Sequence, residues 1–294
     1  MPLWGRRLKL KALARHKEHL MTTDQIILAC RPPTEFKLFT VYAGLGKGKS
    51  AYAIFVLVEV LMNWYKIRER EAWEMVKSFI CFHPQQFFKK LRQIRDEGLV
   101  RVPGIIWDDA GLWLYALDWN DPFVKALGKY MNVARSRLAS LILTTPTPVW
   151  IIKKLRGFPD AFNISIIKTT GAPGTQWVRE AKGYQEVMLP DMRKSRIHHR
   201  YSDDFNCYMP DEFFVWYKPL RDAYEVLALD LIEKSWDISR AKSVVPELKD
   251  YPALKIPDMV KPTRVDDAPA YRKFPGLKRK KNREIVGSVD LGTY

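Results

Sequence analysis

Three glycines, two lysines and a serine lie within seven residues, Gly44-Leu45-Gly46-Lys47-Gly48-Lys49-Ser50. An apolar segment precedes this stretch and a long apolar segment follows it, which predicts the order strand, loop, helix. Bare glycine backbone and a helix N-terminus bind phosphate, a lysine there reaches the β- and γ-phosphates, and a hydroxyl there binds Mg²⁺. We therefore expect a site for ATP and Mg²⁺, with these cofactor-binding residues: Gly44, Gly46, Lys47, Gly48, Lys49, Ser50 and Ala51.

The stretch departs from the usual pattern G-x-x-x-x-G-K-[ST] at its first position, where Ala43 replaces glycine. If the opening turn needs a positive φ, Gly44 next to it would have to supply it. Lys47 is an additional cation, which we expect to lie over the phosphates. The alternative interpretation is a flexible basic turn without a ligand.

Two adjacent acids, Asp108 and Asp109, end the apolar segment that begins at Gly104. Phosphoryl transfer needs a carboxylate near the Mg²⁺ and a group that orients the attacking water. We expect Asp108, together with Ser50, to hold the metal and Asp109 to polarise the water. Between Lys49 and Asp108 there is room for a helix, a strand and a second helix. A surface turn with two acids is the alternative.

Apolar segments alternate with helical ones over much of the chain. Strands are expected at 37–43, 78–84, 104–107, 140–148 and 163–171, and helices at 49–70, 85–98, 121–139 and 149–157. Strict alternation predicts a three-layer α/β fold with a mainly parallel central sheet, which places ligands at the carboxyl ends of the strands.

The pattern changes after Gly171. We expect a hairpin at 175–189, an irregular basic and aromatic loop at 192–210 and a helix at 217–235. The predicted organisation is a basic N-terminal arm (1–37), an ATPase core (38–170), a mixed C-terminal subdomain (171–238) and a Pro-rich basic tail (239–294), largely disordered.

Over residues 38–170 the chain resembles the P-loop ATPases that have an additional strand between Walker A and Walker B and a second acid after the Walker B aspartate. This class includes the AAA+, FtsK–HerA and Zot-like proteins, some carried by archaeal viruses and plasmids. The resemblance implies a polar sensor at the end of the 140–145 strand, which we take to be Thr145 rather than Thr144. It also implies a ring in which an arginine reaches the neighbouring subunit's nucleotide.

Arg156 is the first candidate for that arginine, before Arg135 and Arg137. The expected catalytic residues are therefore Asp109, Thr145 and Arg156. Asp109 stands where the class usually has glutamate, which predicts slow activation of water. No glutamine stands at the sensor position, which favours chemistry like that of AAA+ proteins over a DNA pump.

Net charge is +16 and the isoelectric point is about 9.7, which favours a polyanionic partner, DNA before an anionic membrane. Three cysteines without paired spacing indicate a reducing compartment. No apolar run reaches the roughly 20 residues of a membrane-spanning helix. We expect a cytoplasmic protein, in the host cytoplasm if it is viral.

The predicted function is that of an ATP-hydrolysing protein that acts on DNA as a motor, loader, packaging or replication ATPase. One alternative is a nucleotide-dependent switch or assembly protein with little turnover. Another is a small-molecule enzyme, because the loop is also similar to the "GNGKGKT" loop of corrinoid adenosyltransferases.

Overall fold

The computed structural model describes residues 19–98, 101–159, 161–168, 178–188 and 195–236. Its helices and strands, in chain order, are α2 (Met21–Cys30), β1 (Lys37–Tyr42), α3 (Lys49–Tyr65), α4 (Glu69–Val76), β2 (Ile80–Cys81), α5 (Pro84–Asp96), β3 (Ile105–Trp107), α6 (Pro122–Tyr130), β4 (Ser140–Thr145), α7 (Lys153–Arg156), β5 (Phe162–Lys168), β6 (Val178–Met188), β7 (Ser195–Asn206) and α8 (Asp211–Trp236). Short 3-10 turns lie at Lys77–Phe79, Ala110–Leu112, Ala116–Asp118, Ala134–Ser136 and Pro148–Trp150.

The strands form one seven-stranded sheet in the order β2-β3-β4-β1-β5-β6-β7. The first five are parallel, and β6 and β7 join antiparallel at one edge. An α/β fold with a mainly parallel sheet is therefore confirmed. β4 lies between β1 and β3 although it follows both in the sequence, so the carboxyl ends of these three strands are neighbours.

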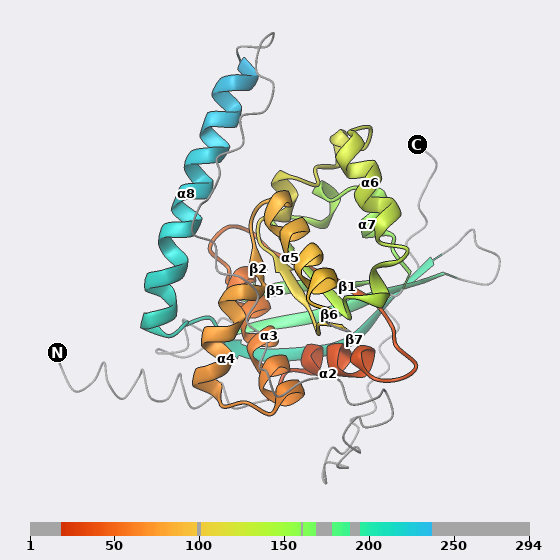
Figure 1. Cartoon of the computed structure of the whole chain (residues 1–294), viewed down its shortest axis with the longest axis vertical. Coiled ribbons are helices and arrows are strands. Elements are labelled where there is room, and N and C mark those ends of the chain that lie inside the picture. Colours follow the sequence, from red (N-terminus) through yellow and green to blue (C-terminus); the bar gives the residue numbers. More distant parts are fainter. Residues whose placement is uncertain (1–18, 99–100, 160, 169–177, 189–194, 237–294) are drawn as a thin grey trace, which may run out of the picture.

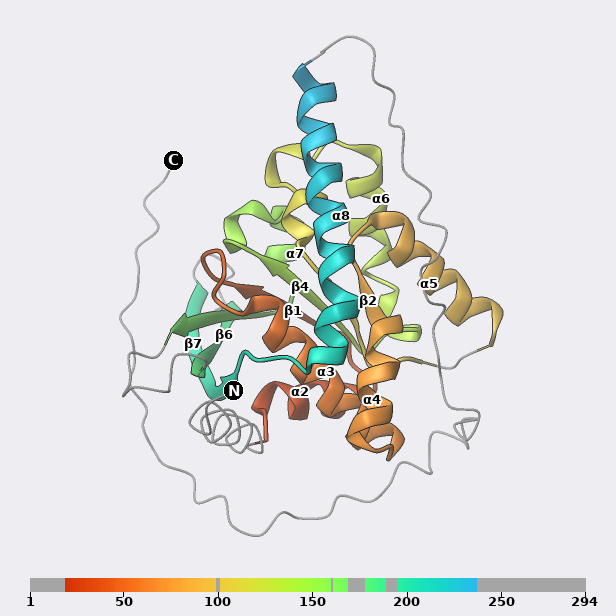
Figure 2. The same ribbon diagram turned by 90° about the vertical axis from the view of Figure 1, so that its left-hand side faces the viewer.

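The helices cover both faces of the sheet. From β1 the chain crosses to β2 at the edge of the sheet, and it then returns through β3 and β4 to β5 on the other side of β1. Because such crossovers are right-handed, the connection from β1 to β2 lies on one face of the sheet and the later connections lie on the other. Figures 1 and 2 show this arrangement, with α3 and α4 on one side of the sheet and α5, α6 and α7 on the other. The direction reverses at β1, which makes its carboxyl end the expected ligand position.

Several predicted elements differ from the observed ones. The hairpin expected at 175–189 is, in its described part, the single strand β6, which pairs with β5 and β7. The helix expected at 49–70 ends at Tyr65, because Lys66 takes a left-handed conformation (φ 57°) before α4 begins. The helix expected at 121–139 ends at Tyr130. The region 192–210, expected to be an irregular loop, contains β7, in which the buried Asp203 interrupts an otherwise apolar inward face.

The predicted C-terminal subdomain also shares the central sheet, because β6 pairs with β5 over the whole length of β5. α8 then runs past the carboxyl ends of β2 and β3, and its C-terminal half extends away from the layers (Figure 1). The predicted tail at 239–294, and residues 1–18 of the predicted arm, lie outside the described residues.

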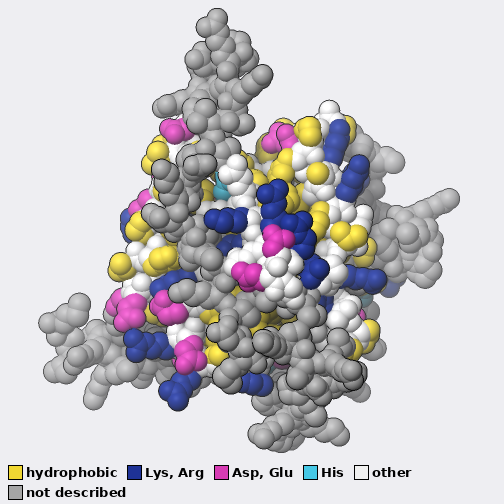
Figure 3. Space-filling view, in the orientation of Figure 1, with side chains coloured by type: hydrophobic (Ala, Val, Ile, Leu, Met, Phe, Trp, Pro, Cys, Tyr) yellow, Lys and Arg dark blue, Asp and Glu magenta, His cyan; other side chains and the backbone are white. Residues whose placement is uncertain are grey.

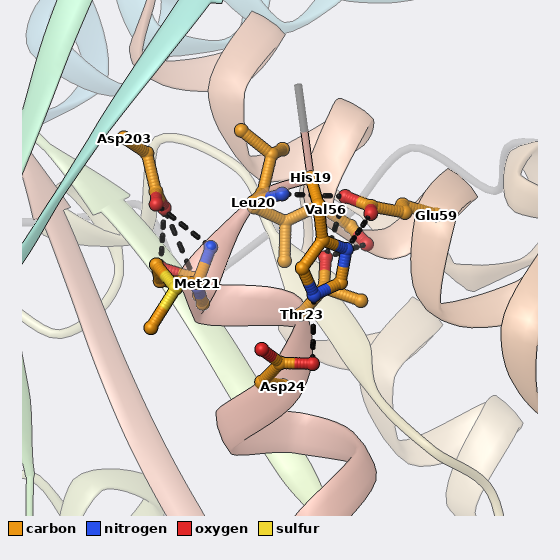
Figure 4. A network of polar contacts seen from close by, with 9 residues as sticks. His19, Leu20, Met21, Thr23, Asp24, Val56, Glu59 and Asp203 are labelled. Carbon is orange, nitrogen blue, oxygen red and sulfur yellow. Dashed lines mark hydrogen bonds and ion pairs between the residues drawn. The ribbon is translucent and has the colours of Figure 1, made fainter. Parts of the chain in front are cut away.

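Residues 21–30 of the predicted arm form α2, which packs on the body of the protein. Asp203 from β7 accepts hydrogen bonds from the backbone N–H groups of Met21 (2.7 Å) and Thr22 (3.3 Å). A carboxylate at a helix N-terminus satisfies N–H groups that have no partner within the helix. Beside it, Glu59 of α3 accepts from Leu20 N (3.1 Å) and Thr23 Oγ1 (3.0 Å), as Figure 4 shows.

Candidate nucleotide-binding site

The glycine loop connects the carboxyl end of β1 to the N-terminus of α3. Gly46 (φ 69°) and Gly48 (φ 92°) have left-handed backbone conformations, which only glycine adopts without strain. A Cβ atom at Gly48 would lie 3.0 Å from Cys207 Cβ, so the end of β7 packs directly against the loop. Ala43 has no positive φ, so its departure from the usual pattern does not strain the turn.

The two loop lysines occupy different environments. Lys49 is the first residue of α3 and is 7 % exposed, and its Nζ donates to the Gly44 carbonyl at 3.4 Å. Burial lowers the pKa of Lys49, while the carboxylates of Asp109 and Asp108 act in the opposite direction. Lys47 is exposed, and its side chain lies beside Gly44, where a Cβ atom would come within 3.9 Å of Lys47 Cγ. A bound phosphate would supply the anion that a buried lysine needs.

Asp108 connects the loop to the neighbouring strands. It follows β3 directly and is 1 % exposed, and its Oδ1 accepts from Ser50 Oγ at 2.8 Å and from Thr144 Oγ1 at 2.5 Å. Its Oδ2 accepts from the hydroxyl of Tyr217 in α8. Sequence reasoning predicted that Ser50 and Asp108 would lie together, and the structure places them in direct contact.

A serine hydroxyl and a carboxylate are oxygen ligands of the kind that Mg²⁺ prefers, and Mg²⁺ often takes only one or two protein ligands beside phosphate and water. The pair Ser50 and Asp108 fits that description. Within the described part of the chain, no group of three or more His, Cys, Asp and Glu residues is placed to hold a metal ion.

Asp109 lies beside Asp108 with a left-handed backbone (φ 49°). Its N–H donates to Thr144 Oγ1 at 2.8 Å, which fixes this unusual conformation. Burial, followed by the charge of Asp108, raises the pKa of Asp109 to about 6, and the charges of Arg221 and Lys49 oppose the rise. A carboxyl group with a pKa near neutrality is suited to accept a proton or orient water.

The strand end that should carry the sensor presents Thr144, and not Thr145, to the two acids. Thr144 Oγ1 donates to Asp108 and accepts from the N–H of Asp109, whereas Thr145 Oγ1 donates to the Thr147 carbonyl at 3.1 Å. Thr145 also lies against Gly111, where a Cβ atom would come within 2.7 Å of its Oγ1. We therefore move the proposed sensor role from Thr145 to Thr144.

The candidate arginines lie on other elements. Arg156 ends α7 and is half-buried, Arg135 lies in the turn Ala134–Ser136 and is exposed, and Arg137 follows that turn. A role in a neighbouring subunit's site stays a prediction for all three.

Two residues of α8 complete the surroundings of the acids, and sequence reasoning did not select them. Tyr217 is 2 % exposed and contacts Asp108, and the charge of Arg221 acts on both Asp109 and Lys49. A separation of 109 residues between Tyr217 and Asp108 leaves no local signal for this contact. The four-residue spacing of Tyr217 and Arg221, on one helix face, was the available hint.

Among the residues that the structure describes, no helix combines the length and apolar character needed to cross a membrane.

Comparison with known proteins finds viral relatives. The uncharacterized protein B-251 of Sulfolobus spindle-shape virus 1 is 24% identical over 205 residues, which cover 69% of this chain and 80% of that protein. The uncharacterized protein ORF286 of Acidianus two-tailed virus is 24% identical over 168 residues, covering 56% of this chain and 53% of that protein. The chain thus spans about half the length of ORF286. No family model matches the chain.

Among solved structures, the chain is similar to the KaiC-like protein PH0186 from Pyrococcus horikoshii OT3, with 16% identity and a TM-score of 0.30. The aligned part covers 56% of this chain and 82% of that one. At this TM-score the two folds agree only in part, and the case for a nucleotide site rests on the geometry of the loop and the acids.

Proposed function

We propose that this chain is a P-loop ATPase of the additional-strand class, carried by an archaeal virus or a related mobile element. The observation that carries the proposal is the hydrogen bond between Ser50 of the loop and Asp108 at the end of β3. Because β4 lies between β1 and β3, this hydrogen bond joins the phosphate loop to the carboxylate proposed to hold the metal. Asp109, the second acid, and Thr144, at the polar end of β4, lie beside that carboxylate.

Each residue has a defined task in this proposal. The loop N–H groups and Lys49 bind the phosphates, and Ser50 and Asp108 hold Mg²⁺, which would neutralise charge on the β- and γ-phosphates. Thr144 fixes the orientation of both acids, and Asp109 orients the attacking water and accepts its proton. The viral relatives support the proposed source.

We further propose that the ATPase acts on DNA through a basic surface formed by α6, α7 and the turn Ala134–Ser136. Residues 122–157 include no Asp or Glu and seven cations: Lys125, Lys129, Arg135, Arg137, Lys153, Lys154 and Arg156. Lys129 and Lys154 line one hollow of about 290 Å³ between α6 and α7. Figure 3 shows Lys and Arg side chains gathered on the face over α5 and α6. Such a surface suits a phosphate backbone.

Assembly into a ring is proposed on a separate observation. Large apolar side chains are exposed after β3 and β4, namely Leu117 (74 %), Trp119 (65 %), Val149 (59 %) and Trp150 (43 %). The two segments are neighbours, because Tyr115 pairs with Ile151 and its ring contacts that of Trp150. Exposed apolar groups on neighbouring segments commonly mark an interface between proteins. A ring would also bring a neighbour's arginine, for which Arg156 stays the first candidate, to the nucleotide.

The decisive experiment compares ATP binding and steady-state hydrolysis by the wild type and Lys49→Ala, each without DNA, with single-stranded DNA and with double-stranded DNA. We expect turnover that DNA stimulates and that Lys49→Ala abolishes. Lys218→Ala, at an exposed lysine of α8 that pairs with Asp222, is the control. Absence of binding and turnover in the wild type would contradict the proposal.

The same experiment separates a second candidate function. Both carboxylate oxygens of Asp108 already accept hydrogen bonds from protein groups, which favours a nucleotide-dependent switch with little turnover. Tight ATP binding without hydrolysis, unchanged by DNA, would support that function instead.

A further inference from the structure

The paired ends of β6 and β7 form a two-stranded ribbon that extends beyond the rest of the sheet. β5 pairs with β6 only as far as Gln185, whereas β7 pairs with it as far as Met188. The ribbon consists of residues 185–188 and 195–200, and Figure 1 shows it projecting to the right of the layers. All residues of β7 from 196 to 200 are exposed. Packing in the core therefore does not account for their side chains.

A β-bulge interrupts the pairing of β6 and β7 at the base of the ribbon. Gly183 pairs with Tyr201, but the next pair is Tyr184 with His199, which leaves Arg200 as an additional residue in β7. A residue added to one strand changes the face on which the following side chains lie. The bulge therefore reverses the inward and outward positions of β7 within the ribbon.

Arg196, His198 and Arg200 share one face of the ribbon as a result. Opposite residues of an antiparallel pair point to the same face, and Gln185 is opposite both Phe162 and His198. Arg196 lies on that face by alternation, and Arg200 lies there because its Nε donates to Gln185 Oε1 at 2.9 Å. Among the described residues, no other side chain forms a hydrogen bond or ion pair with the side chain of Arg196 or of His198. The face thus presents two guanidinium groups and an imidazole to solvent.

The opposite face of the ribbon has a different character. There Glu186 lies opposite Ile197, which is 63 % exposed, and the ring of Tyr184 contacts that of His199 with 5.4 Å between the centroids. An acid and an apolar group make this face unsuited to a polyanion. Charge complementarity therefore selects the Arg196, His198 and Arg200 face for one.

The ribbon begins next to the basic surface of α6 and α7. Pro159 lines the hollow between these helices and lies three residues before Phe162, which is opposite Gln185 at the base of the ribbon. A polyanion bound on the α6–α7 surface would therefore reach the ribbon as well. A second copy of this chain is a poor occupant, because a bulge and cations on an edge strand oppose pairing between edges.

We propose that the ribbon inserts its Arg196, His198 and Arg200 face into the major groove of duplex DNA. The inference rests on the proposed action on DNA and specifies the form of the DNA, a B-form duplex. The major groove of B-DNA is about 12 Å wide and admits a two-stranded β-ribbon, and arginine side chains there donate to guanine O6 and N7. The major groove of an RNA duplex is too deep and narrow for side chains to read, and a single strand has no groove.

The test measures dissociation constants by fluorescence anisotropy for a DNA duplex, an RNA duplex and single-stranded DNA of the same sequence. We expect the double variant Arg196→Gln and Arg200→Gln to raise the constant for the DNA duplex about tenfold or more, since a lost bidentate contact to a base has an effect of that size. The constants for the RNA duplex and the single strand should rise by no more than about threefold, since these exposed charges act on them only through solvent and salt.

The matched control is the double variant Arg70→Gln and Lys218→Gln, which removes the same charge from exposed positions on α4 and α8. It should raise all three constants by no more than about threefold, because charges beyond a Debye length of the DNA are screened. Arg196→Lys with Arg200→Lys keeps the charge but lacks the planar fork, so we expect it to recover only part of the duplex affinity.

Methylation of guanine N7 by dimethyl sulfate reports on the major groove directly, because N7 faces that groove. The wild type should protect guanines of the DNA duplex from methylation. Arg196→Gln with Arg200→Gln should leave them reactive even at protein concentrations that restore binding.

Equal losses for the three nucleic acids, no loss for the DNA duplex, or guanines that the wild type does not protect would each overturn the insertion of the ribbon. The α6–α7 surface would still be upheld if Lys129→Gln with Lys154→Gln weakens binding. Failure of the wild type to bind any DNA would overturn the proposed action on DNA and this inference with it.

Discussion

Asp109 combines burial, a left-handed backbone and a raised pKa at one residue. The hydrogen bond from its N–H to Thr144 holds the backbone in a left-handed conformation, which few residues other than glycine adopt. The side chain therefore points in a different direction from the one it would take if β3 continued through Asp109. Burial and the charge of Asp108 raise the pKa of Asp109 to about 6. The protein thus holds a carboxyl group whose protonation changes close to neutral pH.

The pH dependence of hydrolysis should follow this group. As the acceptor of a proton, Asp109 must be ionised, so kcat/KM should fall as the pH drops below about 6 and level off above it. Asp109→Asn should lower kcat by about 100-fold or more, because general-base catalysis typically contributes that much. Steady-state rates between pH 5 and pH 8, on either side of about 6, measure both effects.

Asp118→Asn serves as the control for Asp109, since Asp118 is an exposed acid nine residues further along the chain. It should retain the wild-type rate and profile. A flat profile for the wild type, or full activity of Asp109→Asn, would show that another group activates the water.

Thr144 and Thr145 differ in what their hydroxyls do, and a pair of variants separates them. Thr144→Val leaves the Asp109 N–H without its acceptor and removes one donor to Asp108, so we expect kcat to fall by at least about tenfold, the value of roughly one lost hydrogen bond to a charged group. Thr145→Val removes only the bond to the Thr147 carbonyl and should stay within about threefold. The opposite ranking would restore Thr145 as the sensor.

The sequence could not decide between these two threonines. Their side chains point to opposite faces of β4, and the choice depends on the register in which β3 and β4 pair. In the structure Trp107 pairs with Leu143, so the next residues, Asp108 and Thr144, lie side by side. Nothing in the residue types of either strand fixes that register.

α2 depends on contacts from distant parts of the chain. His19 forms ion pairs with Asp24 (2.7 Å) and with Glu59 of α3, as Figure 4 shows. The hydrogen bonds that the His19 ring donates to these two carboxylates, Asp24 first, raise the pKa of His19 from 6.5 to about 10. The protonated imidazole therefore holds the start of α2 against α3 at neutral pH.

Removal of this imidazole should destabilise the protein in a limited pH window. Because the folded-state pKa is raised, the stabilisation is complete below about pH 6.5 and disappears as the pH rises through about 10. His19→Gln should therefore lower the melting temperature by a few degrees at pH 6 to 7.5, and by less at higher pH. The shift corresponds to a loss of about 1 kcal/mol in the free energy of unfolding, because water screens the ion pairs.

Thermal denaturation followed by circular dichroism at several pH values measures this effect. His198→Gln, at an exposed histidine of β7, should change the melting temperature little at any pH. A loss of stability in His19→Gln that does not diminish toward pH 10 would contradict the role given to the charged imidazole.

The elements differ in how far the sequence alone predicts them. β1, β3 and β4 are largely continuous buried runs, and the alternation of strands with helices predicted both the parallel sheet and the position of the site. β7 could not be predicted in the same way, because a buried aspartate, Asp203, stands where its inward face should be apolar. That carboxylate is explained by α2 and α3, which are far from β7 in the sequence: the first N–H groups of α2 and the Tyr52 hydroxyl of α3 donate to it.

The proposed nucleotide site and the basic surface share β4. The carboxyl end of β4 holds Thr144 beside the acids, and the segments before and after this strand carry the seven cations of residues 122–157. A phosphate backbone bound along α6 and α7 would therefore contact the segments that precede and follow β4 in the sequence. β4 also positions Asp109, the proposed catalytic acid. This continuity is the physical basis for expecting DNA to alter the rate of hydrolysis.

The double variant Lys129→Gln and Lys154→Gln tests the basic surface. Both lysines line the hollow between α6 and α7, so the pair should contact phosphate groups together. If each neutralises one phosphate, the slope of log affinity against log salt concentration should become less steep by about 1.4 to 1.8, with the smaller value for single-stranded DNA. Fluorescence anisotropy with a labelled oligonucleotide, between low and physiological salt, measures that slope.

A matched double variant, Arg70→Gln and Lys218→Gln, removes the same charge from exposed positions on α4 and α8. If binding needs only the high net charge, both double variants should weaken it equally and change the slope equally. If DNA contacts the α6–α7 surface, only the double variant Lys129→Gln and Lys154→Gln changes the slope. That variant should also reduce the stimulation of ATP hydrolysis by DNA. Its DNA-free rate should stay within about twofold of wild type, since neither lysine adjoins the acids. An unchanged slope in that variant would exclude the α6–α7 surface as the DNA contact, whatever the outcome for the ATPase itself.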